Sequence, residues 1–423
     1  MKNNFLKNGH LKFVLKNGFL HIFSANLINK IIQFCSGVIL IRFFSKEEYG
    51  QYSYAGNILS LFLLVEGIGV CSGLLQYASE NISSEKKLGY VKIAFRYGAL
   101  FDIILGFIIF IFTLFFSLPI DGSSIILRWM FLIPLFSFIF NIIETYLRST
   151  LKNFQYSALS VMNTSLVLVC SIIGAILYNI LGVIIGRYIA YLITDIIALI
   201  MIRKELCLIK TVPLPIKEER NVFIKYSITS MLCNSISGLL YLIDTFLVGL
   251  IIRDSSTVAA YKTSTVIPFA LNFIPSSVMI FVYPYFARIN TNKSKFKQYY
   301  FTLIKYMGCL NILISLLFFI CAPWIINIVF GNNYSDIIIP FRILALGFFF
   351  VGTFRIPSGN LLAAAEKIKV NFYLSIISGV TNIVLDILFI LWWGATGAAI
   401  STVCIFILDG SISTLFLYNY LRK

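Results

Sequence analysis

The chain has 423 residues, of which 59% are hydrophobic and only 12% are charged, whereas soluble domains carry about 25% charged residues. This composition excludes an ordinary soluble protein and indicates an integral membrane protein. The formal net charge is +16, but the basic residues form no helical face or patch interleaved with aromatic residues. Nucleic acid is therefore not an expected partner.

In chain order, the sequence contains twelve apolar segments, each near or above the length of about 20 residues that a helix needs to cross a bilayer. They comprise residues 20–41, 55–77, 94–117, 124–147, 157–178, 181–202, 224–250, 258–286, 302–326, 337–362, 371–392 and 395–418. The sequence therefore predicts an all-α integral membrane protein with about 12 transmembrane helices.

Lysine and arginine are distributed unevenly between alternate loops. Most of these basic residues fall in the loops on one side of the membrane or at the adjoining helix ends. The loops and helix ends on the other side hold only Arg42, Lys46, Arg128, Arg187 and Arg253. By the positive-inside rule, both termini are expected to be cytoplasmic. The basic stretch before the first segment is expected to be a cytoplasmic lead-in, since it lacks the continuous apolar core of a signal peptide.

Weak internal similarity divides the chain into two halves. In each half a loop that contains a tyrosine leads into a predicted helix, and a second tyrosine lies near the end of that helix. The last predicted helix of each half begins with closely spaced glycines. The matching residues are Tyr52 and Tyr77 with Tyr261 and Tyr285, and Gly182 and Gly186 with Gly394 and Gly397. We therefore expect two pseudo-symmetric six-helix bundles, residues 1–212 and 213–423, around a central cavity.

The stretch Tyr241–Arg288 holds two apolar segments, and each contains an ionisable residue, Asp244 or Lys262. A charge at the centre of a bilayer costs about 2.5–3.5 kcal/mol even on insertion scales, so such residues usually face water or a partner. The second segment also contains three prolines, which bend a helix and free backbone carbonyls. This pair of segments is expected to line a water-filled cavity.

Further charges lie inside the apolar segments. Lys30, Glu66 and Arg355 lie deep or beside helix-breaking residues, as Asp244 and Lys262 do, and for all five a functional role and a structural ion pair are both open. Four others lie near helix ends, and their side chains are expected to extend to the membrane–water interface or to form simple ion pairs. These four are Glu144, Asp195, Arg342 and Asp409.

No pattern of residues indicates catalysis or a cofactor. The chain has two histidines and no nucleophile-elbow, Walker or dinucleotide-binding sequence. The eight cysteines show no paired spacing, so neither a metal site nor a disulfide framework is expected. The protein is therefore not expected to be an enzyme or to require a cofactor.

Several segments carry a resemblance to a known family. The stretch RFFSKEEYGQYSYAG (Arg42–Gly56) resembles the first outer loop of bacterial polysaccharide flippases, in the multidrug, oligosaccharidyl-lipid and polysaccharide (MOP) exporter superfamily. Further similar stretches are Leu242–Gly249, Ala259–Ser264, Ala322–Tyr334, Leu361–Asn371 and Gly394–Thr402. The resemblance runs through both halves, and its specificity comes from the order and spacing of these motifs.

This resemblance implies a flippase that moves an undecaprenyl-pyrophosphate-linked oligosaccharide repeat unit across the bacterial inner membrane by alternating access. The product would serve the synthesis of O-antigen, the polysaccharide of lipopolysaccharide, or of a related surface polysaccharide. Other polysaccharide-assembly proteins are candidate partners.

The roles of individual charged residues rest on charge and depth alone. Lys30, Lys262 and Arg355 are candidates to bind the pyrophosphate. Glu66 and Asp244 are candidates to take up H⁺ or Na⁺ as coupling ions, or to neutralise those cations. A permanent Asp244–Lys262 ion pair is the structural alternative.

Three other functions remain open at this point. A drug or cation antiporter of the same superfamily would share the architecture, with more carboxylates and aromatic residues in its cavity. A polysaccharide polymerase or membrane glycosyltransferase would be equally apolar, but polymerases usually have a large outer loop and every outer loop here is short. A scaffold without transport activity would have little reason to retain buried charges and several prolines in one helix.

Overall fold

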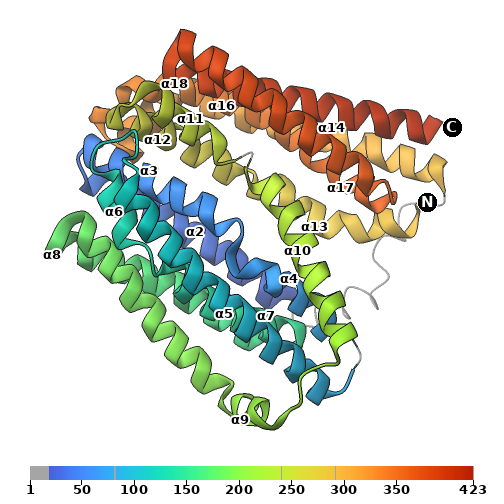
Figure 1. Ribbon diagram of the computed structural model, residues 1–423. Helices are drawn as coiled ribbons and strands as arrows, with labels where there is room; N and C mark the ends of the chain where they lie inside the picture. The colour runs from blue at the N-terminus through green and yellow to red at the C-terminus, as the bar shows by residue number, and fades with distance from the viewer. Residues whose placement is uncertain (1–18, 81, 240, 291, 423) are drawn as a thin grey trace. The chain divides into compact units, whose positions relative to one another are not determined.

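The computed structural model describes residues 19–422, apart from 81, 240 and 291 (Figure 1). Over these residues the chain is helical and contains no strand. The N-terminal part is built from α2 (Phe19–Phe43), α3 (Lys46–Leu63), α4 (Val70–Ala78), α5 (Ser84–Phe115), α6 (Ser123–Trp129), α7 (Ile133–Ser149), α8 (Asn153–Met201) and α9 (Arg203–Thr211). The predicted basic lead-in lies mostly outside the described residues.

The remaining helices follow in chain order (Figure 1). They are α10 (Lys217–Leu239), α11 (Ile243–Ile252), α12 (Ser255–Leu271), α13 (Phe273–Arg288), α14 (Lys293–Ile320), α15 (Ala322–Val329), α16 (Ile338–Phe350), α17 (Ile356–Ala364) and α18 (Ile368–Arg422). Two short 3₁₀ segments, Glu66–Gly69 and Asn332–Ile337, and a π-helical turn, Val351–Arg355, connect some of them.

The all-α membrane architecture is confirmed, but the count of twelve crossings is not. Among the described residues, eight helices are long and apolar enough to cross a membrane, or nine if α6 and α7, which meet at 47°, form one crossing. Two of the eight, residues 153–201 and 369–422, contain 49 and 54 residues. Each is about twice as long as a crossing requires, which is about 20 residues.

Both long elements fold back on themselves. In α8, a Cβ on Gly182 would meet the backbone carbonyl of Gly174, although residues eight apart in a straight helix lie about 12 Å from each other. The helical conformation breaks between them, since Asn179 has a φ of 53°. In α18, Gly394 has a φ of 59°, and a Cβ on Gly397 would meet the carbonyl of Phe389. Glycine is therefore needed at these turns so that the two arms can approach closely.

The proline-containing segment is also broken. The predicted segment 258–286 is covered by α12 and α13, which are separated at Asn272, and Pro268 lies inside α12. A proline removes a backbone donor and clashes with the preceding turn, so a break within one turn of it is expected. An interruption of the helix is therefore present near the prolines, while residues 255–288 still form one apolar span of 34 residues; the size of a bend stays a prediction.

The described chain divides into two compact units. Unit 1 comprises the described residues up to Leu40 together with Phe62–Ser117 and Ser124–Ser235, and unit 2 comprises Ile41–Leu61, Leu118–Ser123 and the described residues from Ile236 onward. Unit 2 thus includes most of α3, which is joined to later segments by polar contacts. Lys46 pairs with Asp336 at 2.6 Å, and the Asn57 amide donates to the carbonyl of Leu242 at 3.1 Å. The division into halves at residue 212 stays a prediction.

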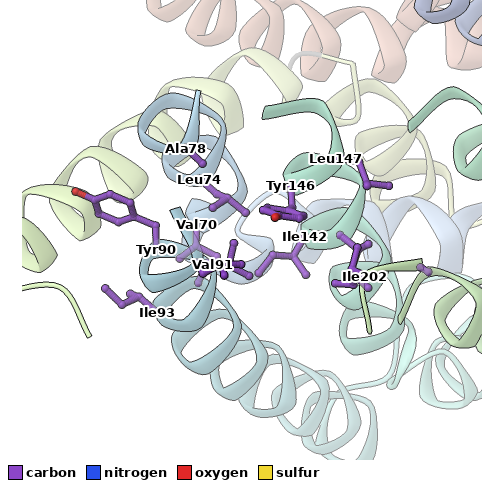
Figure 2. Close-up of a cluster of buried hydrophobic side chains, with 14 of the residues drawn as sticks. Val70, Leu74, Ala78, Tyr90, Val91, Ile93, Ile142, Tyr146, Leu147 and Ile202 are labelled. Carbon is purple, nitrogen blue, oxygen red and sulfur yellow. The ribbon is translucent and has the colours of Figure 1, made fainter. Parts of the chain in front are cut away.

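The core of unit 1 is formed by α4, α5 and α7 (Figure 2). Leu74 and Ile142 have no exposed surface, and Tyr146 lies beside them with 7% exposed. Because lipid tails are as apolar as these side chains, burial alone gives little preference for one arrangement of helices. Close packing and buried polar contacts must therefore decide which helices meet, and they also define the candidate sites.

Candidate functional site

The first group of buried polar residues lies in unit 1, where the crossing that contains α3 and α4 is interrupted. Gly67, Ile68 and Gly69 have φ values of 55°, 51° and 75°, a left-handed conformation that frees backbone groups from the helical ladder. Asp102 on α5 is fully buried and accepts a hydrogen bond from the Gly67 amide at 2.9 Å. A buried carboxyl group therefore holds the break in place.

Glu66 lies at this break. Its carboxylate accepts a hydrogen bond from the Ser137 hydroxyl and another, at 2.9 Å, from the Asn141 amide. Both donors are neutral and both lie on α7, so Glu66 joins two elements without forming an ion pair. Lys30, in the same unit, is exposed on α2 and is not paired with Glu66. The structure therefore does not bring these two predicted site residues together.

The second group lies in unit 2 and is centred on Asp244, which is 4% exposed. Asp244 lies in the first turn of α11. Its Oδ2 accepts hydrogen bonds from the Tyr261 hydroxyl on α12 at 2.9 Å and from the Thr402 hydroxyl on α18 at 2.7 Å. The carboxylate therefore ties the neighbouring helices α11 and α12 to α18, which is far from them in the sequence.

A second carboxylate completes this group. Asp386 on α18 has no exposed surface, lies against Asp244, and accepts a hydrogen bond from the Asn382 amide at 3.2 Å. Asn382 also contacts the Ser401 hydroxyl at 3.3 Å. The Oδ1 atoms of Asp244 and Asp386 find no hydrogen-bond donor within the described structure. Two adjacent buried carboxyl groups cannot both stay ionised without a cation between them. Otherwise one of them holds a proton.

The chemistry of this group suits a small hard cation or a proton. Asp244, Asn382 and Thr402 line a cavity of about 20 Å³, and a volume of about 10–15 Å³ is enough for one water molecule. The ligand atoms are carboxylate, amide and hydroxyl oxygens, which hard cations prefer. Within the described part of the chain, no group of three histidine, cysteine or acidic residues suits a multivalent metal ion. Two carboxyl groups among neutral oxygen ligands can hold H⁺ or a monovalent cation such as Na⁺.

Lys262 does not pair with Asp244. It is half-buried and directly follows Tyr261, which takes the position next to the carboxylate. Successive residues in a helix point about 100° apart, so only one of the two can face Asp244. The alternative of a permanent Asp244–Lys262 ion pair is therefore not seen in this structure.

Arg355 lies at the end of the π-helical turn and is held on several sides. Its Nε pairs with Asp409 at 2.9 Å, and its NH1 donates to the Tyr241 hydroxyl at 3.2 Å. The guanidinium also lies over the rings of Tyr241 and Phe406, at 5.6 and 5.4 Å. Asp409, expected to extend to the interface or to form a pair, therefore forms a pair.

Arg355 borders two spaces in unit 2. One is the small cavity that it shares with Asp244, and the other is a hollow of about 340 Å³ that is also lined by Asn360, Asn371 and Ser413. The structure thus places Arg355 and Asp244, which were predicted separately, on the wall of one cavity. Lys262 does not line either of these spaces.

The partners of Asp244 were not predicted from the sequence. Asp386 is a charge within the apolar segment 371–392, and Asn382 and Thr402 are neutral polar residues within such segments. A signal was present, since Asn382 and Asp386 are four residues apart and so lie on one face of a helix. Their meeting with Asp244 depends on tertiary packing, which spacing along the chain does not show.

Comparisons with known proteins place this multi-helix membrane fold in a family and among solved structures of the same fold. The chain belongs to the family described as polysaccharide biosynthesis protein, whose family model matches residues 39–339. The resemblance recognised in the sequence is therefore confirmed at the level of the family. No curated protein sequence matches the chain.

The similarity to solved structures covers nearly the whole chain. The lipid II flippase MurJ, in an inward closed conformation, has a TM-score of 0.71 and 17% identity, covering 95% of this chain and 87% of that one. A multidrug resistance MATE family transporter of the MOP superfamily, inward-facing, has a TM-score of 0.72 and 13% identity, covering 93% and 94%. A MOP superfamily transporter from Pyrococcus furiosus has a TM-score of 0.62 and 15% identity, covering 96% and 95%.

Proposed function

We propose that the protein is a flippase that moves an undecaprenyl-pyrophosphate-linked oligosaccharide repeat unit from the inner to the outer leaflet of the bacterial inner membrane. The observation that carries this proposal is the position of Arg355 in unit 2. Its guanidinium borders both a polar hollow of about 340 Å³ and the small cavity of Asp244. A pyrophosphate cannot cross about 30 Å of hydrocarbon unaided, and a buried arginine beside a polar space lowers that cost.

Arg355 is suited to a phosphate because its planar guanidinium can donate two parallel hydrogen bonds to two oxygens. At present Asp409 accepts one of its hydrogen bonds and Tyr241 another. A phosphate group would compete with Asp409 for the same donors. We therefore assign Arg355 as the principal pyrophosphate ligand, with Lys262 and Lys30 as further candidates.

Asp244 and Asp386 supply the energy coupling in this proposal. A proton or Na⁺ bound between them removes the repulsion of two adjacent charges and changes what Asp244 can accept from Tyr261 and Thr402. Because these three residues lie on α11, α12 and α18, occupancy of the site biases the packing of three helices. Glu66 has two neutral donors and is assigned a charge-balancing or secondary coupling role.

The remaining elements of the proposal follow from the charge distribution and the family. By the positive-inside rule the basic loops favour cytoplasmic termini, and other polysaccharide-assembly proteins are expected partners. A drug or cation antiporter is retained as a second candidate, because a buried carboxylate pair such as Asp244 and Asp386 also suits a cationic cargo.

The test is a gene deletion complemented by variants at matched membrane abundance. Lipid-linked repeat units should accumulate in the inner leaflet after deletion, wild-type protein should clear them, and Arg355→Ala should not. Arg422→Ala, at an exposed arginine near the end of α18, is the matched control and should behave as wild type. Altered drug susceptibility without accumulation of lipid-linked units would favour the antiporter and overturn the proposal.

A further inference from the structure

A separate hollow lies within unit 1, formed by α4, the end of α7 and α10, with a volume of about 660 Å³. Its wall includes Gln76, Ser79, Arg148, Tyr226, Thr229 and Asn234. None of these residues belongs to the sites of Glu66, Asp244 or Arg355. The volume is within the range of about 300–1,000 Å³ that is usual for small-molecule sites.

The lining of this hollow is unusual for a membrane segment. Two side-chain amides, several hydroxyls and one guanidinium reach it from three helices. Gln76, Thr229 and Asn234 are exposed, so their polar groups can reach a ligand. Arg148 is also exposed, forms none of the four described ion pairs, and has Glu144 as its nearby acidic residue one helical turn away.

These groups match a sugar better than they match a lipid, a drug or a free phosphate. A saccharide presents many hydroxyls that each donate and accept, and amides and hydroxyls are the side chains that can do both. Tyr226 adds an aromatic ring, on which the C–H face of a sugar can pack. Sites for apolar drugs are lined mainly by hydrophobic side chains, whereas neutral groups that both donate and accept predominate among the polar side chains of this hollow.

The hollow also reaches the helix ends where loading must occur. The C-terminal ends of α4 and α7, which border it, are at the side predicted to be cytoplasmic from the basic loops, and the middle of α10 forms the rest of its wall. The repeat unit reaches a flippase from that side. The ligand's sugars and its pyrophosphate can then be held by different parts of the protein.

We propose that the hollow formed by α4, α7 and α10 is a saccharide-binding subsite, which holds the sugars of the lipid-linked oligosaccharide from the cytoplasmic side. This rests on the proposed function for the identity of the ligand. Gln76 and Asn234 exchange hydrogen bonds with sugar hydroxyls, Tyr226 packs on a sugar face, and Arg148 donates to sugar oxygens at the rim.

Cys233 lies in the wall of the hollow and provides a direct reporter. The other seven of the eight cysteines are replaced by alanine, and alkylation of Cys233 by N-ethylmaleimide is followed in purified protein in nanodiscs. The probes are the lipid-linked oligosaccharide extracted from a deletion strain, undecaprenyl pyrophosphate without sugar, and the free oligosaccharide released by mild acid. At about ten times its Kd, a ligand leaves about a tenth of the sites free, so alkylation should slow about tenfold.

The inference predicts protection by the intact lipid and, at higher concentration, by the free oligosaccharide, but not by undecaprenyl pyrophosphate. Equal protection by undecaprenyl pyrophosphate would show a phosphate site, and no protection by any probe would show that the hollow binds none of them. Either result overturns the inference.

Variants provide the second measurement. Gln76→Ala and Asn234→Ala should weaken protection by the intact lipid at least several-fold, whereas Gln155→Ala, at an exposed glutamine on α8 of the same unit, should not. If deletion of the gene causes accumulation but these variants bind and transport normally, the subsite fails and the flippase stands. If deletion causes no accumulation while the free oligosaccharide still protects Cys233, the proposed function fails and the saccharide site stands.

Discussion

Replacing Asp244 by asparagine tests the coupling site most directly. The change keeps the shape of the side chain, and the Asn oxygen can still accept from the Tyr261 and Thr402 hydroxyls, which lie at 2.9 and 2.7 Å from Asp244 Oδ2. Only the charge beside Asp386 is lost. A change in ion dependence would therefore report on the charge rather than on the packing of the three helices.

The expected magnitude follows from the proximity of the two carboxylates. A unit charge about 4 Å from another contributes about 4 kcal/mol at an effective dielectric constant of about 20. Part of this loss is offset, because the repulsion between Asp244 and Asp386 disappears with the same substitution. The free energy of cation binding should therefore become less favourable by on the order of 1–3 kcal/mol, which corresponds to a cation affinity weaker by about 5- to 150-fold.

The assay is binding of radiolabelled Na⁺ to purified protein, together with transport of lipid-linked oligosaccharide in proteoliposomes under imposed Na⁺ or H⁺ gradients. If Na⁺ is the coupling ion, Asp244→Asn should lose Na⁺ binding and Na⁺-driven transport. If H⁺ is the ion, the variant should lose the dependence of transport on the pH gradient.

Asp336→Asn is the matched control for this experiment. Asp336 lies in the same unit but pairs with Lys46 at 2.6 Å, and its side chain is 53% exposed. It should leave ion dependence unchanged, since a solvated pair contributes about 0–1 kcal/mol. An Asp244→Asn protein that binds Na⁺ like wild type and responds equally to both gradients would refute the reasoning.

Three further predictions concern topology, substrate and stability. In intact cells, the cysteine of Lys46→Cys should react with an impermeant thiol reagent, because residue 46 is predicted to face outward. Labelling of the cysteine of Lys293→Cys, predicted to be cytoplasmic, would contradict this topology. Lys262→Ala should reduce export more than Lys297→Ala, and equal export would remove Lys262 from the site. Asp254→Ala should destabilise the protein by about 0.5–2 kcal/mol, since Asp254 accepts from the Thr257 amide at 2.7 Å as the N-cap of α12. The Thr257 hydroxyl and then the Thr257 amide, both of which donate to Asp254, lower the pKa of its carboxyl, so the contribution should be present at neutral pH and lost as pH falls through the lowered pKa, as melting curves of wild type and variant would show.

The apolar segments predicted much of the fold because a membrane requires long apolar helices, and the length of a segment is visible in the sequence. The turns at Asn179 and Gly394 fall where one predicted segment ended and the next began. The break at Asn272 follows from the prolines around it. These features are local, and local features can be read from a sequence.

The candidate site was less accessible from the sequence, since depth in a segment does not show which way a side chain faces. Lys30 has an exposed side chain and does not pair with Glu66, which its place in the segment did not show. A direct ion pair between Lys262 and Asp244 was one alternative, yet the neighbouring Tyr261 makes the hydrogen bond to that carboxylate. Asp386 reaches Asp244 from a helix more than a hundred residues later, and only the folded chain brings them together.

The contacts of Arg355 connect substrate binding with ion coupling in the proposed mechanism. Its guanidinium is held by Asp409 and Tyr241 on the wall of the cavity that contains Asp244. If a phosphate takes the place of Asp409, then Asp409 loses its cation but keeps its hydrogen bond from Ser378 on the same long helix as Asp386. An additional buried negative charge without a partner favours uptake of a cation nearby. Substrate binding should therefore strengthen cation binding, and by reciprocity the bound cation should strengthen substrate binding.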